Sequence, residues 1–111
     1  MAIRICAVED LAKGAYTRAT LGGNVLAIFR SKDGNYHVVD DMCSHESISL
    51  TAHNQPNLED FVHFTNDYVE CPSHGAKFSF TDGSPTLPAF EPIRVYEVII
   101  ENDEVFVEYE A

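Results

Sequence analysis

Two short segments of this 111-residue chain each place a histidine close to a cysteine. The first segment reads Cys43-Ser44-His45, and the second reads Cys71-Pro72-Ser73-His74. Each spacing lets one loop direct a thiolate and an imidazole toward a common point, and both groups are ligands for iron or zinc. The candidate metal ligands are therefore Cys43, His45, Cys71 and His74.

Two kinds of metal centre are compatible with these ligands. A tetrahedral zinc site can take two cysteines and two histidines, but the usual zinc-finger spacing pairs Cys with Cys and His with His. A [2Fe–2S] cluster with two cysteines on one iron and two histidines on the other takes one ligand of each kind from each loop. The remaining histidines between the two pairs, His53 and His63, are expected to be surface or strand residues.

The composition narrows the function classes. A net charge of -11 would repel phosphate backbones, so nucleic acid is not an expected partner, whereas proteins with basic patches are. No apolar run approaches the roughly 20 residues that span a membrane, and the N-terminus does not have the pattern of a signal peptide. We therefore expect a cytoplasmic protein without membrane contact. The third cysteine, Cys6, lies in an apolar alternation and is expected to be buried rather than disulfide-bonded.

Short alternating segments between turn residues predict an all-β, antiparallel fold of the sandwich or barrel type. No segment longer than about ten residues has a helical period. The polar segment Ser49–Asp60 is expected to be a surface loop with one helical turn at most. Turns are expected at Asp33-Gly34, Asn66-Asp67, Asp82-Gly83 and Asn102-Asp103. The expected strands are Ile3–Val8, Tyr16–Thr20, Val25–Arg30, Tyr36–Val39, Phe61–Thr65, Tyr68–Glu70, Lys77–Phe80, Ile93–Glu101 and Glu104–Tyr109.

The two ligand segments, with Gly75 directly after the second, resemble the cluster loops of the Rieske family, in particular the ferredoxins that supply bacterial oxygenases. Asp82-Gly83 followed by Pro88-Ala89 is similar to the proline-containing loop that covers the cluster in that family. The resemblance covers most of the chain. It implies one Rieske-type [2Fe–2S] cluster, with Cys43 and Cys71 on the inner iron and His45 and His74 on the solvent-facing iron.

The same resemblance implies a fold and a domain organisation. The fold is expected to be an antiparallel Rieske-like β-sandwich with a small cluster-binding subdomain. Residues 1–111 then form a single Rieske domain, in which the cluster-binding loops at about 41–90 are inserted in a basal β-structure formed by 1–40 and 91–111. The segment between the two cysteines is longer than in compact members of the family, and the extra length falls in Ser49–Asp60.

By this resemblance the protein is not an enzyme but the electron-transfer component of a multicomponent dioxygenase system. It is expected to accept an electron from a flavin-containing ferredoxin reductase and to pass it to the Rieske centre of a terminal oxygenase that acts on an aromatic compound. Two alternatives remain open. One is a small Rieske-like subunit of a reductase complex such as nitrite reductase, and the other is a zinc-bound interaction module.

The residue types at four further positions indicate the reduction potential of the expected cluster. Respiratory Rieske proteins carry an extra cysteine in each cluster loop, and the similar positions here are Ile48 and Ser73, so that disulfide cannot form. Those proteins also carry a serine and a tyrosine whose hydroxyls donate hydrogen bonds toward the cluster, where this chain has Ala76 and Phe78. Without those donors the midpoint potential is expected near the low end of the Rieske range, on the order of -150 mV.

Overall fold

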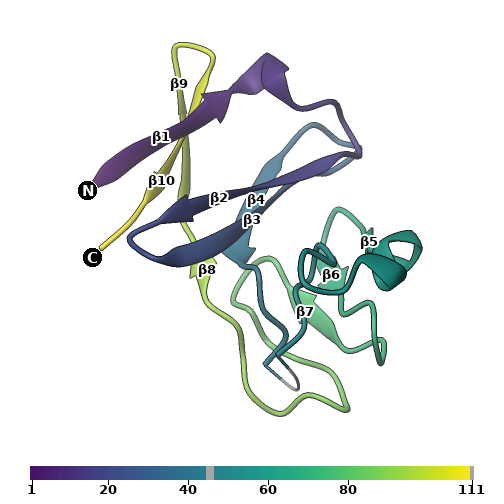
Figure 1. Cartoon of the computed structure of the whole chain (residues 1–111). Coiled ribbons are helices and arrows are strands. Elements are labelled where there is room, and N and C mark those ends of the chain that lie inside the picture. Colours follow the sequence, from purple (N-terminus) through teal and green to yellow (C-terminus); the bar gives the residue numbers. More distant parts are fainter. Residues whose placement is uncertain (45–46, 111) are drawn as a thin grey trace.

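The structure is a computed structural model that describes residues 1–44 and 47–110, and it is nearly all β (Figure 1). Two short 3-10 helices cover Val8–Asp10 and Pro56–Phe61. The second begins in the polar segment for which one helical turn was expected and extends to Phe61, which was expected to begin a strand. The strands are β1 (Ala2–Ala7), β2 (Tyr16–Leu21), β3 (Asn24–Arg30), β4 (Tyr36–Asp40), β5 (His63–Phe64), β6 (Tyr68–Glu70), β7 (Lys77–Ser79), β8 (Val95–Tyr96), β9 (Val98–Glu101) and β10 (Glu104–Glu108).

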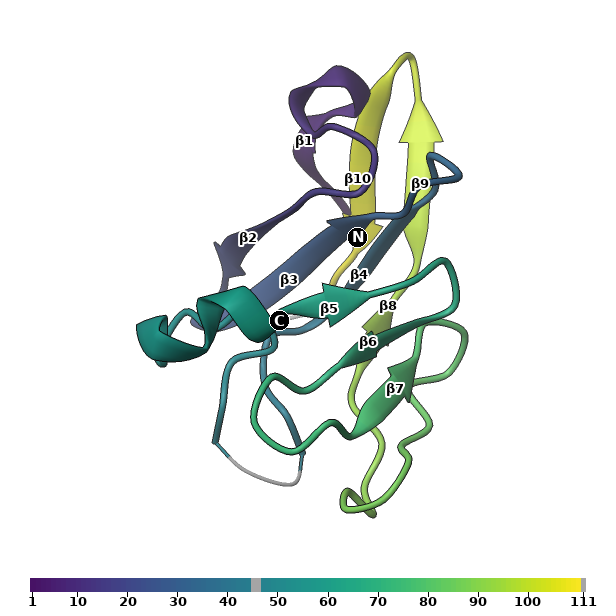
Figure 2. The same ribbon diagram turned by 90° about the vertical axis from the view of Figure 1, so that its right-hand side faces the viewer.

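The strands form three antiparallel sheets, so the prediction of an all-β antiparallel fold is confirmed. The orders are β1-β10-β9, β2-β3-β4-β8 and β5-β6-β7. Figures 1 and 2 show that the first two sheets pack together, and that the third sheet lies with its long loops on the other side of the second. No helix among the described residues is long and apolar enough to cross a bilayer.

Strands β3 and β4 are buried on both faces, which explains their nearly continuous apolar sequence. Along β3, Leu26 and Ile28 enter the core shared with the β1-β10-β9 sheet. The alternate residues Ala27 and Phe29 enter a second core, which also contains Cys43 and Cys71. The middle sheet therefore fixes the position of the cysteine-bearing loops relative to the rest of the molecule.

Aromatic contacts join the middle sheet to the small third sheet. The ring of Phe29 in β3 lies 4.8 Å from that of Phe64 in β5 and 5.6 Å from that of Phe80, which follows β7. His37 of β4 stacks flat on Phe80, with 4.2 Å between ring centroids and 5° between planes. Its Nε2 lies 3.1 Å from the Ser31 hydroxyl, and burial lowers the pKa of His37.

The prediction of a single strand over Ile93–Glu101 was wrong, because the structure divides this segment into two strands at Glu97. Before this residue β8 pairs with β4 in the middle sheet, and after it β9 pairs with β10 in the outer sheet. The Glu97 carbonyl accepts a hydrogen bond from the Glu108 N–H at 2.9 Å. The period-2 pattern continues through the corner because both halves bury a face, so the sequence alone does not reveal the change of sheet.

The hairpin turns follow the sequence, with one difference. Asn102 and Asp103 both have positive φ, 52° and 61°, as the tight β9–β10 turn requires. In the β3–β4 turn only Gly34 has positive φ, at 93°. Asp33 instead accepts a hydrogen bond from the Asn35 N–H at 3.1 Å and another from the Ser31 hydroxyl, so its side chain stabilises the turn.

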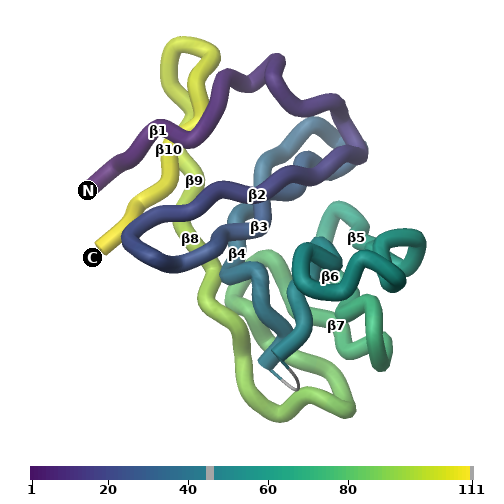
Figure 3. The backbone as a smooth tube through the Cα atoms, in the orientation of Figure 1, coloured from purple at the N-terminus to yellow at the C-terminus, as the bar shows by residue number. Residues whose placement is uncertain are grey.

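The segments around Cys43, Cys71 and Pro88 reach the same end of the molecule, opposite the β9–β10 hairpin, in both Figure 1 and Figure 2. The backbone trace in Figure 3 shows the N-terminal strand running beside the C-terminal one. There the Tyr109 N–H donates to the Met1 carbonyl at 3.0 Å. The cysteine-bearing loops are therefore far from both ends of the described chain.

One close approach of two backbones generates a test of this arrangement. Gly83 has φ +77°, and a Cβ placed there would lie 1.9 Å from the Ile93 carbonyl oxygen. Because the backbone has to move, Gly83→Ala should lower the free energy of unfolding by about 3 kcal/mol or more. The matched control is Gly23→Ala, with φ +84° and nothing within 4 Å, which should cost only about 1 kcal/mol. Urea unfolding measures both, and equal losses would contradict the close approach.

Candidate metal centre

The two loop cysteines lie together in the core beneath the loop end of the molecule. Cys43 and Cys71 are each 2% exposed and belong to the same apolar cluster as Phe78 and Ala89. Cys43 lies close enough to Cys71 to help raise the pKa of its thiol. The structure thus brings together two of the residues that the sequence singled out, although they lie far apart along the chain.

The two cysteine-bearing loops are closed by equivalent backbone hydrogen bonds. The Cys43 N–H donates to the Ile48 carbonyl at 2.8 Å, and the Cys71 N–H donates to the Ala76 carbonyl at 2.7 Å. Each bond runs from the cysteine to the residue five positions later. In the second loop the Gly75 N–H also donates to the Cys71 carbonyl at 3.1 Å, and Gly75 has φ +75°. Glycine is suited to this position because L side chains rarely adopt such a φ.

The electrostatic environment favours a neutral thiol at Cys71 unless a cation is bound. Burial raises the pKa of the Cys71 thiol to about 11, against the effect of backbone N–H groups of Ser73 and His74 that donate to its sulfur. A thiolate, not a thiol, is the metal ligand, and a ferric centre supplies the positive charge that a buried thiolate pair needs. The two sulfurs and the N–H donors beside them therefore fit the inner half of a [2Fe–2S] cluster.

The histidines are placed differently from the cysteines. His74 is exposed, in the turn three residues after buried Cys71. His45 lies outside the described residues. Within the described residues no group of three or more His, Cys, Asp and Glu side chains could hold a single metal ion. A two-iron cluster takes only two protein ligands at each iron. His53 and His63 are exposed, one in the loop after the first cysteine and the other in β5.

A third segment, residues 85–92, contributes to the same end of the molecule. The Ser44 hydroxyl donates to the Glu91 carbonyl, so this segment is joined directly to the first cysteine loop. Ala89 is buried in the core with the cysteines, whereas Leu87 and Phe90 are 72% and 79% exposed. Sequence reasoning identified this loop by its proline and missed the exposed apolar residues beside it. The sequence signal for this surface was the presence of large apolar residues, Leu87 and Phe90, in a turn-rich segment that has no strand-like alternation.

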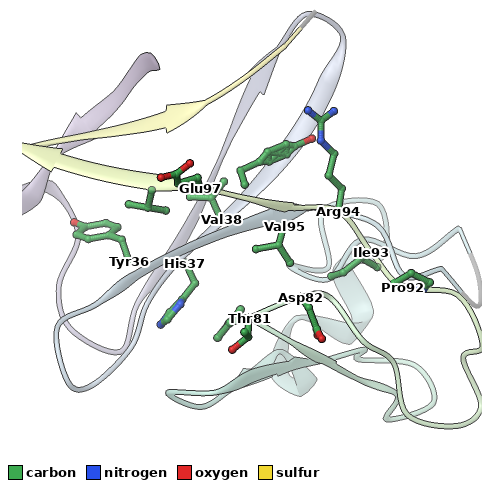
Figure 4. Close-up of a pocket in the computed structure, with 13 residues that line it drawn as sticks. Tyr36, His37, Val38, Thr81, Asp82, Pro92, Ile93, Arg94, Val95 and Glu97 are labelled. Carbon is green, nitrogen blue, oxygen red and sulfur yellow. The ribbon is translucent and has the colours of Figure 1, made fainter. Parts of the chain in front are cut away.

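One cavity of the described structure lies away from the cysteine pair. It has a volume of about 630 Å³ and lies between strands β4 and β8 and the turn that contains Thr81 and Asp82 (Figure 4). No cysteine lines it, and its one histidine is His37. The chemistry expected from the ligand segments therefore belongs to the loop end and not to this cavity.

Comparison with known proteins agrees with the cysteine and histidine ligands expected for a [2Fe–2S] cluster. The model of the Rieske [2Fe-2S] domain matches residues 1–97. The chain is 33% identical, over 93% of its length and 90% of the relative's, to the 3-phenylpropionate/cinnamic acid dioxygenase ferredoxin subunit of Photorhabdus laumondii. It is 31% identical, over 98% of its length and 86% of the relative's, to the ferredoxin component of the p-cumate 2,3-dioxygenase system of Pseudomonas putida.

The chain therefore belongs to the Rieske [2Fe–2S] family, and its cofactor is one Rieske-type [2Fe–2S] cluster. Both relatives are ferredoxin components, so the chain groups with electron-transfer proteins rather than with catalytic subunits. This assignment excludes the zinc-bound interaction module that the ligand types alone had left open.

Solved structures show the same fold. A ferredoxin in a complex of reduced oxygenase and oxidised ferredoxin from carbazole 1,9a-dioxygenase superposes with a TM-score of 0.77 at 28% identity, covering 96% of this chain and all of that one. A small subunit of an NADH-dependent nitrite reductase from Mycobacterium tuberculosis gives a TM-score of 0.79 at 21% identity, covering all of this chain and 96% of that one. The second likeness shows the fold alone, so fold does not separate the two classes. The prediction of a Rieske-like β-sandwich is confirmed.

The absence of hydroxyl donors at two buried positions gives a test of the reduction potential. Ala76 and Phe78 are fully buried in the core that contains both cysteines. Ala76→Ser combined with Phe78→Tyr should raise the midpoint potential, by about 60 mV for each new hydrogen bond of about 1.4 kcal/mol to the reduced cluster. A redox titration followed by absorbance measures the shift. The control Ala27→Ser, in the same core but in β3, should leave the potential unchanged. A strongly positive midpoint in the unmodified protein would contradict the argument.

Proposed function

We propose that this protein carries one electron at a time from a flavin-containing ferredoxin reductase to the Rieske centre of a terminal aromatic-ring-hydroxylating oxygenase. The observation that supports this most directly is the pair of buried thiols at one end of a small domain. The relatives that share this sequence over nearly its whole length are ferredoxin components of dioxygenase systems for phenylpropionate and cumate. The likeness to a nitrite reductase small subunit shows the fold alone, so it does not favour that alternative over this function.

The proposed ligands are Cys43 and Cys71 on the inner iron and His45 and His74 on the outer iron. The closeness of the two cysteine side chains supports the inner pair. The exposure of His74 supports an iron that faces solvent. An electron can then leave through the histidine side of the cluster without crossing the domain.

Single substitutions test this ligand set. His74→Ala or His45→Ala should abolish the Rieske absorbance and EPR signals, because the outer iron loses a donor, and Cys43→Ser should do the same at the inner iron. Iron content per chain gives a second measurement. His53→Ala and His63→Ala are the matched controls, since both residues are exposed histidines of the same subdomain. Loss of the signals in a control, or their survival in His74→Ala, would show that the ligand set is wrong.

We also propose that residues 1–111 form a single Rieske domain, with a cluster-binding part at about 41–90 inserted between 1–40 and 91–111. The order of the strands supports this division. β1 to β4 precede the insertion, β5 to β7 lie within it, and β8 to β10 follow it. The return of the chain to pair β8 with β4 and β10 with β1 joins the two flanking parts into one basal structure.

The proposed acceptor docks on the loop end. This surface includes Ser73 and Gly75 of the second cysteine loop and Pro88 of the third loop. Leu87 and Phe90 add exposed apolar area to it. Glu46, which was expected to contribute to the same surface, lies outside the described residues. The net charge of -11 favours a partner that presents basic residues around an apolar recess.

A reconstituted assay tests both the function and the docking surface. The protein is mixed with NADH, a flavin-containing reductase and an aromatic-ring oxygenase, and product formation should depend on the presence of this protein. Phe90→Ser should slow reduction of the oxygenase about thirty-fold while leaving the cluster spectrum intact, since an aromatic anchor that becomes buried in the complex contributes about 2 kcal/mol. Ile100→Ser, an exposed apolar position on β9 at the opposite end, is the control.

Salt provides an independent measurement in the same assay. Raising the ionic strength should slow electron transfer, because screening over roughly 8–10 Å weakens the attraction between an acidic carrier and a basic partner. Rates that do not depend on salt would remove electrostatic steering from the proposal. A lack of product with every oxygenase and reductase pair, together with an intact cluster, would overturn the function itself.

A further inference from the structure

A buried carboxylate lies at the base of the first cysteine loop. The side chain of Asp41 is only 1% exposed. Its Oδ2 accepts hydrogen bonds from the Ser49 hydroxyl at 2.6 Å and the Thr51 hydroxyl at 2.8 Å, and its Oδ1 accepts from the Thr51 N–H at 2.9 Å. Asp41 precedes Cys43 by two residues, and Ser49 directly follows the residue that closes the loop. This carboxylate therefore ties together the two ends of the loop that presents Cys43.

The groups around Asp41 can supply the hydrogens that a carboxylate accepts. The Ser49 hydroxyl oxygen already accepts from the N–H groups of Thr51 at 3.2 Å and His53 at 3.0 Å, so its own hydrogen is left to donate to Asp41. The Thr51 hydroxyl oxygen accepts from Arg18 Nε at 3.0 Å, and its hydrogen likewise points to Asp41. The two hydroxyls also lie 3.1 Å from each other. All three hydrogen bonds at Asp41 can be accepted by its oxygens, as an ionised carboxylate would accept them.

The positive charge that opposes Asp41 is more exposed than the carboxylate. Arg18 Nε lies 3.9 Å from Asp41 Oδ2, and the Arg18 side chain is 37% exposed. Its Nη2 donates to the Thr51 carbonyl at 3.2 Å. Solvent screens the charge of Arg18 far more than it screens the charge of Asp41. The pair therefore leaves a residual negative electrostatic potential near the core that contains Cys43.

We propose that Asp41 is a positioning residue for Cys43, and that its buried charge, partly offset by Arg18, lowers the reduction potential of the cluster. The proposal rests on ligation of the cluster by Cys43. Reduction adds one electron from the reductase to a ferric centre that becomes ferrous, and a nearby buried anion makes that addition less favourable. Hydrogen bonds from Ser49 and Thr51 then serve two purposes, since they stabilise the anion and hold the loop closed.

Variants that change charge in opposite directions test the electrostatic part. Asp41→Asn keeps the shape of the side chain and should raise the equilibrium constant for reduction about ten-fold, which is about 59 mV for one electron. Arg18→Gln removes the offsetting cation and should lower that constant about three-fold. Loosening of the loop alone would not produce opposite signs. Glu101→Gln, an exposed acid on β9 at the far end, should change nothing.

Thr51→Val separates charge from loop geometry. It removes hydrogen bonds at the base of the loop but leaves both charges, so it should lower the thermal unfolding midpoint with little change of potential. Amide hydrogen exchange provides a readout that does not involve the cluster signal. Exchange at the Cys43 and Thr51 N–H groups should be faster in Asp41→Asn and in Thr51→Val, and unchanged in Glu101→Gln.

The outcomes distinguish this inference from the proposed function. An unmodified protein without a Rieske spectrum would overturn the function and the ligand set. A normal spectrum, with a potential that is unchanged or lower in Asp41→Asn, would overturn the role of the Asp41 charge only. If Asp41→Asn does not fold, Arg18→Gln still decides the question, because an unchanged or higher potential there contradicts the proposal. A shift in Thr51→Val as large as that in Asp41→Asn would show that geometry and not charge sets the effect.

Discussion

Burial of two sulfurs in one apolar core is the constraint on which the rest of this structure depends. Cys43 and Cys71 are nearly inaccessible to water, and two thiolates in such a place repel each other and lose their hydration. Either protonation or a positively charged centre between the loops removes that cost, and only the second leaves the sulfurs free to act as metal ligands. The backbone N–H groups that donate to the Cys71 sulfur stabilise negative charge there and need no side chain to do so. The iron–sulfur cluster that defines this family supplies such a positively charged centre.

The middle sheet makes such a site possible in a chain of this size. β3 and β4 bury residues on both faces, so a single pair of strands contributes to two cores. One core fixes the outer sheet, and the other fixes the loops that hold the cysteines. The close contact of Gly83 with Ile93 joins the second core to the segment that re-enters the middle sheet at β8. Precise placement of two distant loops thus follows from ordinary strand pairing.

The sequence predicted the strands and the cysteine-bearing loops because both depend on local patterns. The alternation of Glu104–Tyr109 and the turn at Asn102-Asp103 are examples. It did not predict the division at Glu97, since alternation continues when a strand changes sheets. It also missed Asp41, although Asp41 and the pair Ser49 and Thr51 flank the first loop. Their hydrogen bonds form only when the loop closes, and nothing in a linear pattern shows which polar residue lies at the base of a loop.

Two features near the proposed ligands would lower the reduction potential under the proposals made above. Ala76 and Phe78 place no hydroxyl donor beside the second loop, and an anion at Asp41 lies at the base of the first. Each feature makes an added electron less stable, and neither costs the fold a buried polar group without a partner. The proposed transfer from a flavin to an oxygenase requires such a low potential, because the electron must be released to the acceptor after it has been accepted. Under this proposal the same two loops provide both the packing that stabilises the domain and the electrostatics that favour release of the electron.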